Sequence, residues 1–251
     1  MILKITALIP ARLSSTRLPR KVLADINGRP LIWHVWQRVC HAKEINQVYI
    51  ATDSDEVRSI AEAFGAKVLM TSPDCQSGTE RIASVIDKLE GDLILNVQGD
   101  EPLVDPGMLD ALVAAWKKDP CDLITPVFKI QSIEELTSPN VVKVARASDG
   151  RALYFSRSPI PFLRDHPQNT WLEHADFWGH IGVYGYDRTV LQEYSRLPFS
   201  PLEQMERLEQ LRFLEAGYCI RTVETAYRPN AVDVAEDLER VRRLLKEEQG
   251  L

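Results

Sequence analysis

Cysteines are few in this sequence, and none of them lies at the spacing of a metal or redox site. The four cysteines among 251 residues form no C-x-x-C pair and have no histidines near them at zinc-ligand spacing. The sequence therefore offers no zinc site and no dithiol redox centre. We expect Cys40, Cys75, Cys121 and Cys219 to be reduced and mostly buried.

Long apolar runs are also absent. No apolar segment approaches the roughly 18 residues that a membrane span needs. The N-terminal segment is interrupted by Lys4 and Pro10 and is followed by no small-residue cleavage site, which argues against a signal peptide. We therefore expect a cytoplasmic protein that does not act at a membrane.

Positive charge is not in excess, since 36 acidic residues against 30 lysines and arginines give a formal net charge of −6. A general nucleic-acid-binding protein would spread basic residues over one face. The charge balance therefore argues against a nucleic-acid partner and favours a small molecule.

The first 120 residues alternate between strand and helix patterns. Residues 2–9 form an apolar, partly β-branched run that predicts a buried strand ending at Pro10, and Pro30 suits the first position of the next helix. The later elements are predicted as strands at 47–53, 66–70 and 92–97 with helices between them, the last over 106–118. This alternation is typical of an α/β fold with a mostly parallel sheet covered on both faces.

The segment from about 121 to 195 is predicted to be β-rich. Its strand patterns, with little helix between them, are "CDLITPVF", "NVVKVAR", "ALYFSR" and "HIGVYGYD", and "SDGR" at 148–151 predicts a tight hairpin turn. We expect this segment to be an extension within a single domain that spans residues 1–251. A long helix capped by Ser200 is then predicted to run to Gly217.

Acidic residues are missing from the first 24 positions. The five positive charges of this segment come from Lys4, Arg12, Arg17, Arg20 and Lys21. Local salt bridges therefore cannot balance the charge, and exposed ion pairs stabilise a fold by only about 0–1 kcal/mol. We interpret the segment as a polyanion-binding loop at the carboxyl end of the first strand, where open α/β sheets bind their ligands. From this segment alone, a solvated basic loop remains the alternative.

A triphosphate suits the chemistry of this basic loop, "IPARLSSTRLPRK" at 9–21. Arginine offers a planar fork of donors, lysine a point charge, and Ser14, Ser15 and Thr16 add hydroxyl groups. The loop is neither a Walker P-loop nor a dinucleotide fingerprint, because the glycine spacings of both are missing.

Asp100 is the best metal candidate in the chain. It follows the buried strand in "NVQGDEP", and carboxylate oxygens suit Mg²⁺, which takes one or two of them together with phosphate oxygens and waters. The alternative is an aspartate that serves only a Gly-Asp turn.

The chain resembles the bacterial 3-deoxy-manno-octulosonate cytidylyltransferases, also called CMP-Kdo synthetases, from about residue 5 to 243. The motifs that carry this resemblance are "IPARLSSTRLPRK", "DINGRPLIWHV", "IATD", "SGTERIA", "NVQGDEP", "ALYFSR", "HIGVYGY" and "SPLEQMERLEQLR". The resemblance implies a three-layer nucleotide-diphosphosugar transferase-like fold with a mostly parallel mixed sheet and an inserted β-rich subdomain. It also implies that CMP is transferred from CTP, with Mg²⁺, to the anomeric hydroxyl of Kdo for lipopolysaccharide synthesis, and that the protein is a homodimer.

The resemblance assigns catalytic roles to Lys21, Asp100 and Asp233. Lys21 and Arg12 would bind the triphosphate of CTP, and Asp100 and Asp233 would bind Mg²⁺. Lys21 would also neutralise the charge of the departing pyrophosphate, which suits a reaction that depends on positioning and electrostatics.

Further CTP contacts are implied for Ser77 and Arg81 in "SGTER". The alternative is that Ser77 or Thr79 only caps a helix that runs to about 89.

Contacts to the sugar acid are implied for six residues, which are Gln98, Arg157, His180, Tyr184, Glu209 and Gln210. Arg157 could clamp the sugar carboxylate with two parallel hydrogen bonds or belong to a surface salt bridge. His180 could contact a sugar hydroxyl or be a satisfied core histidine, and the pair Glu209 and Gln210 could be plain helix-surface residues.

Two departures from the family pattern affect these assignments. The family stretch V-D-T-P-E-D-L reads "VDVAEDL" here, so Asp233 could instead cap the last helix with Glu236 at its third position. Arg20 stands where the family usually has glycine, which leaves the backbone conformation of the basic loop open.

Other functions are compatible with parts of the pattern. The acceptor could be 8-amino-Kdo or a sialic acid, because the shared motifs do not separate these sugars. A nucleotide-sugar-dependent glycosyltransferase would need a D-x-D metal motif, which "DSD" at 53–55 matches, although a capping box of Asp53 and Glu56 explains it better. A catalytically silent nucleotide-binding protein would be expected to lack an acidic metal ligand such as Asp100.

Overall fold

Two compact units make up the chain, and each is described by itself. The computed structural model describes residues 3–15 and 17–248. Unit 1 consists of Met1–Ala114 and Pro229–Leu251, and unit 2 of Ala115–Arg228. Unit 2 has wider boundaries than the β-rich extension that the sequence predicts.

The sheet of unit 1 is parallel and has the order β5-β4-β1-β6. Its strands are β1 (Ile5–Ala11), β4 (Gln47–Thr52), β5 (Lys67–Met70) and β6 (Leu93–Asn96). The chain adds β4 and β5 on one side of β1 and then returns to add β6 on the other side. This change of direction is a topological switch point, where open α/β sheets bind ligands beyond the carboxyl ends of their strands.

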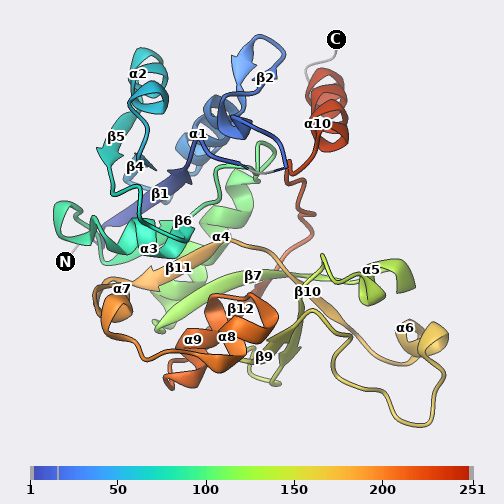
Figure 1. Ribbon diagram of the computed structural model, residues 1–251. Helices are drawn as coiled ribbons and strands as arrows, with labels where there is room; N and C mark the ends of the chain where they lie inside the picture. Colours follow the sequence, from blue (N-terminus) through green and yellow to red (C-terminus); the bar gives the residue numbers. More distant parts are fainter. Residues whose placement is uncertain (1–2, 16, 249–251) are drawn as a thin grey trace. The chain divides into compact units, whose positions relative to one another are not determined.

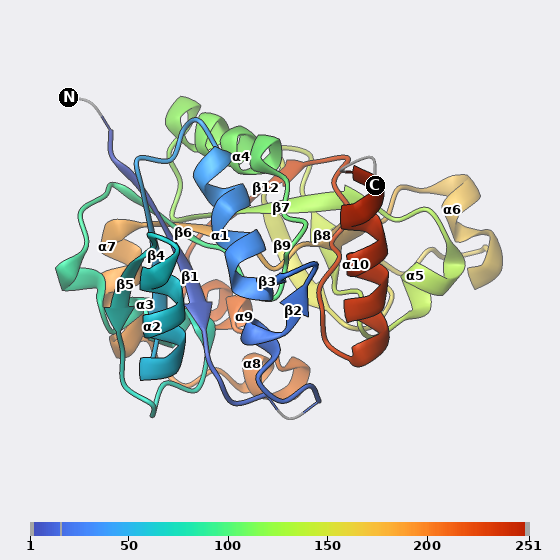
Figure 2. The same ribbon diagram turned by 90° about the horizontal axis from the view of Figure 1, so that it is seen from above.

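Helices of unit 1 follow each strand. They are α1 (Leu31–His41), α2 (Asp55–Ala63), α3 (Gly78–Ala83) and α10 (Ala235–Glu248), with the short hairpin β2 (Asp25–Ile26) and β3 (Arg29–Pro30) before α1. Helix α4 (Pro106–Lys118) begins in unit 1 and ends in unit 2. Figures 1 and 2 show α1 and α2 lying together along one face of the sheet. Helix α1 presents a buried apolar stripe that includes Leu31, Val35 and Val39, so burial of this stripe against the strands stabilises the helix.

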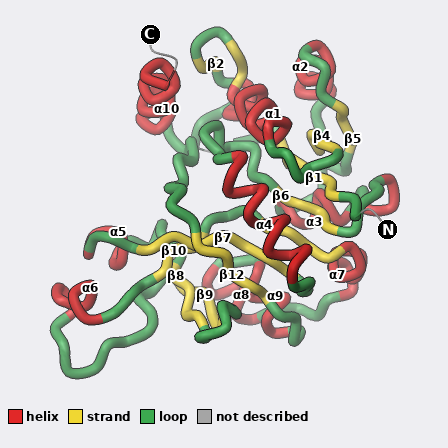
Figure 3. The backbone as a smooth tube through the Cα atoms, turned by 180° about the vertical axis from the view of Figure 1, so that it is seen from behind, coloured by secondary structure: helices red, strands yellow, loops and turns green. Residues whose placement is uncertain are grey.

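The sheet of unit 2 is mixed and is built around β7 (Figure 3). Its strands are β7 (Leu123–Lys129), β8 (Lys143–Arg146), β9 (Ala152–Ser156), β10 (Trp178–His180), β11 (Tyr184–Asp187) and β12 (Ile220–Glu224). One edge of β7 pairs antiparallel with β10 and β11, and β12 pairs with β7 in parallel. Strands β8 and β9 form the antiparallel hairpin predicted from "SDGR", with Gly150 at a φ of 86° in its turn.

Short helices connect these strands. They are α5 (Ile133–Thr137), α6 (Trp171–His174), α7 (Arg188–Glu193), α8 (Pro201–Glu206) and α9 (Gln210–Glu215). The single helix predicted from Ser200 to Gly217 is wrong, because Arg207 adopts a left-handed conformation with φ 54° and ends α8. Ser200 does cap α8, since its side chain accepts a hydrogen bond from the backbone N–H of Glu203.

The single strand predicted for "HIGVYGYD" is also wrong. The chain forms β10 and β11 with a break between them, where the side chain of Thr125 donates to the carbonyl of Val183 at 2.7 Å. A side chain thus replaces part of the strand-to-strand hydrogen bonding. Two smaller expectations fail in unit 1, since Pro10 lies inside β1 and α1 begins at Leu31 with Pro30 as its cap.

The cysteines are less buried than predicted. Cys40 is exposed, and Cys75, Cys121 and Cys219 are half-buried free thiols. Partial burial raises the pKa of Cys121 to about 11, so this thiol stays protonated at neutral pH. Among the helices of residues 3–15 and 17–248, none combines the length and apolar character that a membrane crossing requires.

Candidate nucleotide and metal site

A glycine places Asp100 beside the end of the first strand. The segment after β6 runs close to β1, with the backbone N–H of Val97 donating to the carbonyl of Leu8 at 2.9 Å. A Cβ atom on Gly99 would lie 2.5 Å from the carbonyl oxygen of Pro10, so only glycine fits this close approach. The next residue, Asp100, therefore stands at the switch point of the unit 1 sheet.

Asp233 is brought to Asp100 by backbone contacts. The backbone N–H of Val232 donates to the carbonyl of Asp100 at 2.9 Å, and the N–H of Asn230 donates to the Glu101 carboxylate at 3.1 Å. Glu101 is only 7% exposed, so its carboxylate acts as a buried anchor for the segment that leads into α10. Residues 129 and 132 positions apart in the sequence thus meet at one point.

Lys21 lies between the two aspartates. Its Nζ is 2.7 Å from Oδ2 of Asp100 and 3.1 Å from Oδ1 of Asp233, and its side chain is 13% exposed. Burial alone would lower the pKa of Lys21, but the two carboxylates outweigh burial and raise the pKa above its ordinary value. A positive charge is therefore fixed where both carboxylates can reach it.

Asp233 does not serve as the helix cap that the sequence left open. The carboxylate of Asp237 accepts hydrogen bonds from the backbone N–H groups of Asp233 at 3.0 Å and Val234 at 3.2 Å. Burial works to raise the pKa of Asp237, but these hydrogen bonds and the neighbouring Arg240 outweigh it and lower the pKa. Asp237 therefore caps the start of α10, and the Asp233 carboxylate faces Lys21.

The basic loop forms a concave surface. A cavity of about 390 Å³ is lined by Arg12, Leu13, Ser14, Ser15, Pro19 and Arg20. Within the described part of the chain, Arg12 makes no hydrogen bond or ion pair, so its guanidinium is available to a ligand. Thr16, the third predicted hydroxyl donor, lies outside the described residues.

Other cations of the loop do have partners, although the sequence places no acid near them. Arg17 lies 3.1 Å from Asp233, and Arg20 pairs with Glu56 on α2. The sequence excluded only local salt bridges, and these partners are not local, since even Glu56 lies 36 positions from Arg20. The fold supplies the acids from segments distant in the sequence.

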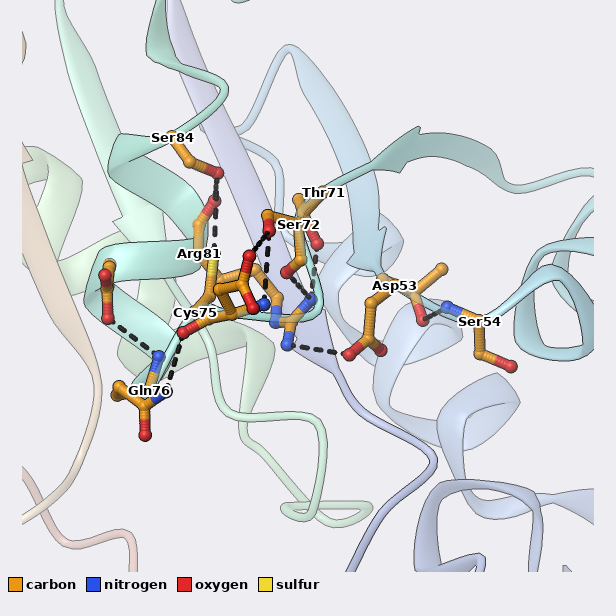
Figure 4. A network of polar contacts seen from close by, with 11 residues as sticks. Asp53, Ser54, Thr71, Ser72, Cys75, Gln76, Arg81 and Ser84 are labelled. Carbon is orange, nitrogen blue, oxygen red and sulfur yellow. Dashed lines mark hydrogen bonds and ion pairs between the residues drawn. The ribbon is translucent and has the colours of Figure 1, made fainter.

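Arg81 belongs to a network of polar contacts at the ends of β4 and β5 (Figure 4), and Ser77 lies four residues before it. Ser77 caps α3, because its side chain accepts from the backbone N–H of Glu80 at 3.1 Å. Arg81 is 3% exposed, and its guanidinium lies 3.3 Å from Asp53 and donates to the side chain of Thr71. Helix α3 ends at Ala83, earlier than predicted, and Arg81 ties it to the strand ends.

The residues of the "DSD" stretch at 53–55 have structural roles, in ion pairs and in the cap of α2. Ser54, and not Asp53, caps α2 by accepting from the backbone N–H of Val57 at 3.3 Å. Asp53 pairs with Arg81, and Asp55 pairs with Arg58 at 2.9 Å. Both carboxylates therefore have cationic partners, which gives the glycosyltransferase alternative no support.

Five of the six predicted sugar-contacting residues belong to unit 2, and Gln98 belongs to unit 1. Gln98 donates to the side chain of Asn96 at 3.3 Å. Asn96 is fully buried, and its Nδ2 has no partner among the described residues. The two amides thus form a short polar chain at the end of β6.

Arg157 uses its side chain on the backbone of unit 2. Its Nε donates to the carbonyl of Glu206 at 2.8 Å and its Nη1 to the carbonyl of Pro139 at 2.9 Å. Both of these donors are therefore occupied by backbone carbonyl groups, which is a bracing role that the sequence did not predict.

His180 and Tyr184 lie together in unit 2 with their ring centroids 5.2 Å apart. Thr125 donates its one hydroxyl hydrogen to Val183, so Nε2 of His180, at 2.9 Å, must donate to Thr125 Oγ1. Desolvation lowers the pKa of His180 to about 3. The imidazole is therefore neutral at physiological pH and keeps Nδ1 as an acceptor.

Glu209 and Gln210 stand at the start of α9. Glu209 is its cap residue, and Gln210 is 4% exposed with no partner for its Nε2 among the described residues. Neither residue lies in the middle of a long helix surface, contrary to the alternative that the sequence left open.

Comparison with known proteins decides the family. The cytidylyltransferase family profile matches residues 6–245. The 3-deoxy-manno-octulosonate cytidylyltransferase of Solibacter usitatus is 48% identical over 244 residues, which cover 97% of this chain and 95% of that protein. The chain belongs to the 3-deoxy-manno-octulosonate cytidylyltransferase family. The enzyme of the same name from Geobacter sulfurreducens is 44% identical, with 97% of this chain and all of that protein covered.

A solved structure supports the same conclusion for the fold of this cytidylyltransferase. The structure of CMP:2-keto-3-deoxy-manno-octonic acid synthetase complexed with CTP has a TM-score of 0.92 and 43% identity, and it covers 98% of this chain and 99% of that one. The fold class and the nucleotidyltransferase activity predicted from the sequence are therefore confirmed. The roles of individual site residues stay predictions.

The sequence reasoning missed several residues that shape the site of this cytidylyltransferase. Glu101 and Asp237 hold the segments that present Asp100 and Asp233, and Thr125 sets the tautomer of His180. The signal for the first two was their place inside the motifs "QGDEP" and "VDVAEDL". Thr125 lies in an apolar strand, where a single hydroxyl gives no comparable signal.

Arg20 gives a prediction about the backbone conformation of the basic loop. Its φ of 59° and ψ of 29° are left-handed, which explains why glycine would suit this position. Arg20→Gly and Arg20→Ala both lose the pair with Glu56, but alanine keeps the backbone strain. We expect the glycine variant to be more stable by about 1 kcal/mol in urea unfolding. Equal stabilities would mean that residue 20 is not left-handed in solution.

His180 gives a prediction about acid stability. The pKa of His180 is about 3 in the folded protein and is higher in the unfolded chain. At a pH between these two values the imidazole is protonated in the unfolded chain and neutral in the folded protein. This stability is present above the unfolded pKa and is lost as the pH falls toward 3. We expect the melting temperature of wild type to fall relative to that of His180→Gln from about pH 7 to about pH 4.5. A constant difference would contradict the buried neutral imidazole.

Proposed function

We propose that this chain transfers CMP from CTP to the anomeric hydroxyl of 3-deoxy-manno-octulosonate, giving CMP-Kdo and pyrophosphate for lipopolysaccharide synthesis. The relatives carry this activity in their names, and nearly all of the chain is covered. The single observation that carries the proposal in the molecule itself is the cluster of Lys21, Asp100 and Asp233 beside the basic loop. The solved relative with CTP supports CTP as the nucleotide.

The donor set at Asp100 and Asp233 suits Mg²⁺. Both ligands are hard carboxylate oxygens, and both already approach one cationic atom, Nζ of Lys21, within 3.1 Å. Among the described residues, no group of three or more metal-ligating side chains is found. This fits Mg²⁺, which takes one or two carboxylates and completes its shell with phosphate oxygens and waters. When bound, Mg²⁺ would neutralise phosphate charge and lower the pKa of the attacking hydroxyl.

The basic loop would bind and orient the triphosphate. Arg12, which is free of partners within the described residues, would bind phosphate oxygens through its planar fork. The anomeric oxygen of Kdo would attack the α-phosphorus, and the bond from that phosphorus to the bridging oxygen of the β-phosphate would break. Lys21 would hold its ammonium group against the pyrophosphate, whose charge grows as this bond breaks. The proton of the hydroxyl passes to solvent, and no side chain is assigned as a general base.

Within unit 2, His180, Tyr184, Glu209 and Gln210 would contact the sugar acid, whereas Arg157 holds the backbone near Glu209 and Gln210. The neutral imidazole of His180 suits a sugar hydroxyl, because Nδ1 can accept a hydrogen bond. The buried Nε2 of Gln210 suits an oxygen of the same ligand. We also propose that the protein is a homodimer and that it is located in the cytoplasm.

Pyrophosphate release tests the function directly. The purified protein is incubated with CTP and Mg²⁺ and with Kdo, 8-amino-Kdo or N-acetylneuraminate, and pyrophosphate is measured by a coupled assay. We expect release with Kdo that depends on Mg²⁺. Preferred turnover of 8-amino-Kdo or N-acetylneuraminate would change the assigned acceptor, and release with none of the three would refute the proposal.

A further inference from the structure

Lys143 on β8 is a fully buried lysine, and among the described residues no carboxylate lies within hydrogen-bond distance of its ammonium group. Its ammonium group has three hydrogens, and all three are donated to backbone carbonyls. The acceptors are Ser138 at 2.8 Å, Val141 at 2.7 Å and Arg157. Burying a charge without a paired ion is unfavourable unless the site is fully hydrogen-bonded, so this lysine fixes the course of two chain segments.

Arg157 extends this brace to a third segment. Its carbonyl accepts from Lys143, and its side chain donates to the carbonyls of Pro139, Glu206 and, at 3.5 Å, Arg207. The Glu206 carboxylate adds two contacts in the other direction. It accepts hydrogen bonds from the backbone N–H of Arg157 at 3.0 Å and from the hydroxyl of Ser156 at 2.6 Å. The loop at 138–141, the end of β9 and the end of α8 are thus held together.

These hydrogen bonds hold the chain at the turn between α8 and α9. Arg207 is left-handed there, a conformation that residues other than glycine seldom adopt. This turn sets the direction of α9, whose first residue, Gln210, is buried with an unpaired Nε2 among the described residues. A shift of the turn would move Glu209 and Gln210 together.

We propose that Lys143 is a positioning residue for the acceptor sugar, which it serves through Arg157 and the turn at Arg207 by fixing Glu209 and Gln210. Lys143 touches neither substrate in this account. Arg157 accordingly acts as a brace. The inference rests on the proposed function, because the contact of Glu209 and Gln210 with Kdo is part of that proposal.

Lys143→Met tests the inference, with Lys129→Met as the matched control. Lys129 is an exposed lysine of the same unit that pairs with Asp176. Steady-state kinetics are measured with Kdo and CTP varied in turn. We expect the Lys143 variant to raise KM for Kdo about tenfold to a hundredfold, as small misplacements of binding groups do. KM for CTP should stay within about twofold of wild type, and Lys129→Met should change neither constant. Equal changes in both KM values, or no change in KM for Kdo, would overturn the positioning role.

A second pair of variants serves if Lys143→Met does not fold. Arg207→Gly keeps the left-handed turn, whereas Arg207→Val disfavours it through its β-branched side chain. We expect only the valine variant to raise KM for Kdo while leaving KM for CTP unchanged. Equal behaviour of the two variants would overturn the inference. Wild-type turnover in the same assay keeps this failure distinct from a failure of the proposed function, in which wild type itself would release no pyrophosphate.

Discussion

Asp100→Asn is expected to lower kcat at least about a thousandfold, because several kcal/mol of charge stabilisation are lost and each ~1.4 kcal/mol is tenfold in rate. The substitution keeps the shape of the side chain and removes the charge that would hold Mg²⁺. The backbone carbonyl of Asp100 still accepts from Val232, so the fold should be retained. Pyrophosphate release and the far-ultraviolet circular dichroism spectrum measure the two effects.

Asp105→Asn is the matched control for this variant. Asp105 lies five residues further on and caps α4 by accepting from the backbone N–H groups of Gly107 at 3.0 Å and Met108 at 3.1 Å. Asparagine caps helices about as well as aspartate, so turnover should stay near the wild-type value. Near-normal turnover of Asp100→Asn, or equal losses in both variants, would remove Asp100 from the catalytic site.

Lys21→Met is expected to lower kcat/KM for CTP by about a hundredfold to a thousandfold, the loss seen when a charge-stabilising group is removed from a reaction centre. It also removes the buried cation that the two carboxylates share, which leaves only the exposed pair of Arg17 with Asp233. Added Mg²⁺ should therefore raise the melting temperature of this variant more than that of wild type, where Lys21 already occupies the position between Asp100 and Asp233.

Arg17→Met is the comparison for Lys21→Met. Arg17 also pairs with Asp233, but its side chain is 67% exposed, whereas that of Lys21 is 13% exposed. Solvent weakens the exposed pair, so we expect a much smaller loss of kcat/KM. Equal losses in the two variants would show that general positive charge, and not the buried ammonium of Lys21, matters.

Regular elements with local start and stop signals could be predicted from the sequence. Helix α4 has the predicted bounds, 106–118, because a proline at its first position and a periodic apolar stripe are local signals. The helix predicted across Arg207 failed for the opposite reason. Arginine has no local preference for a left-handed turn, and the carbonyls on either side of this turn are held by Arg157, 50 residues earlier. No pattern within the segment reports that contact.

In the candidate site, too, features with a local sequence signal could be predicted, and features that depend on long-range contacts could not. Asp100 could be predicted because it follows a buried strand, and such strand ends meet ligands in α/β folds. The position of Asp233 could not be decided between metal ligand and helix cap, because the capping carboxylate is that of Asp237. The pairing of Lys21 with both aspartates depends on contacts more than 75 residues apart in the sequence. Lys143, the first residue of the short strand β8, gave no signal at all.

A crystal soaked with CTP and Mn²⁺ tests the central claim most directly, because manganese scatters anomalously and substitutes for magnesium at oxygen sites. We predict an anomalous peak coordinated by the carboxylates of Asp100 and Asp233, with the triphosphate against the basic loop and in contact with Arg12. Manganese bound elsewhere, or a triphosphate away from residues 12–21, would contradict the account.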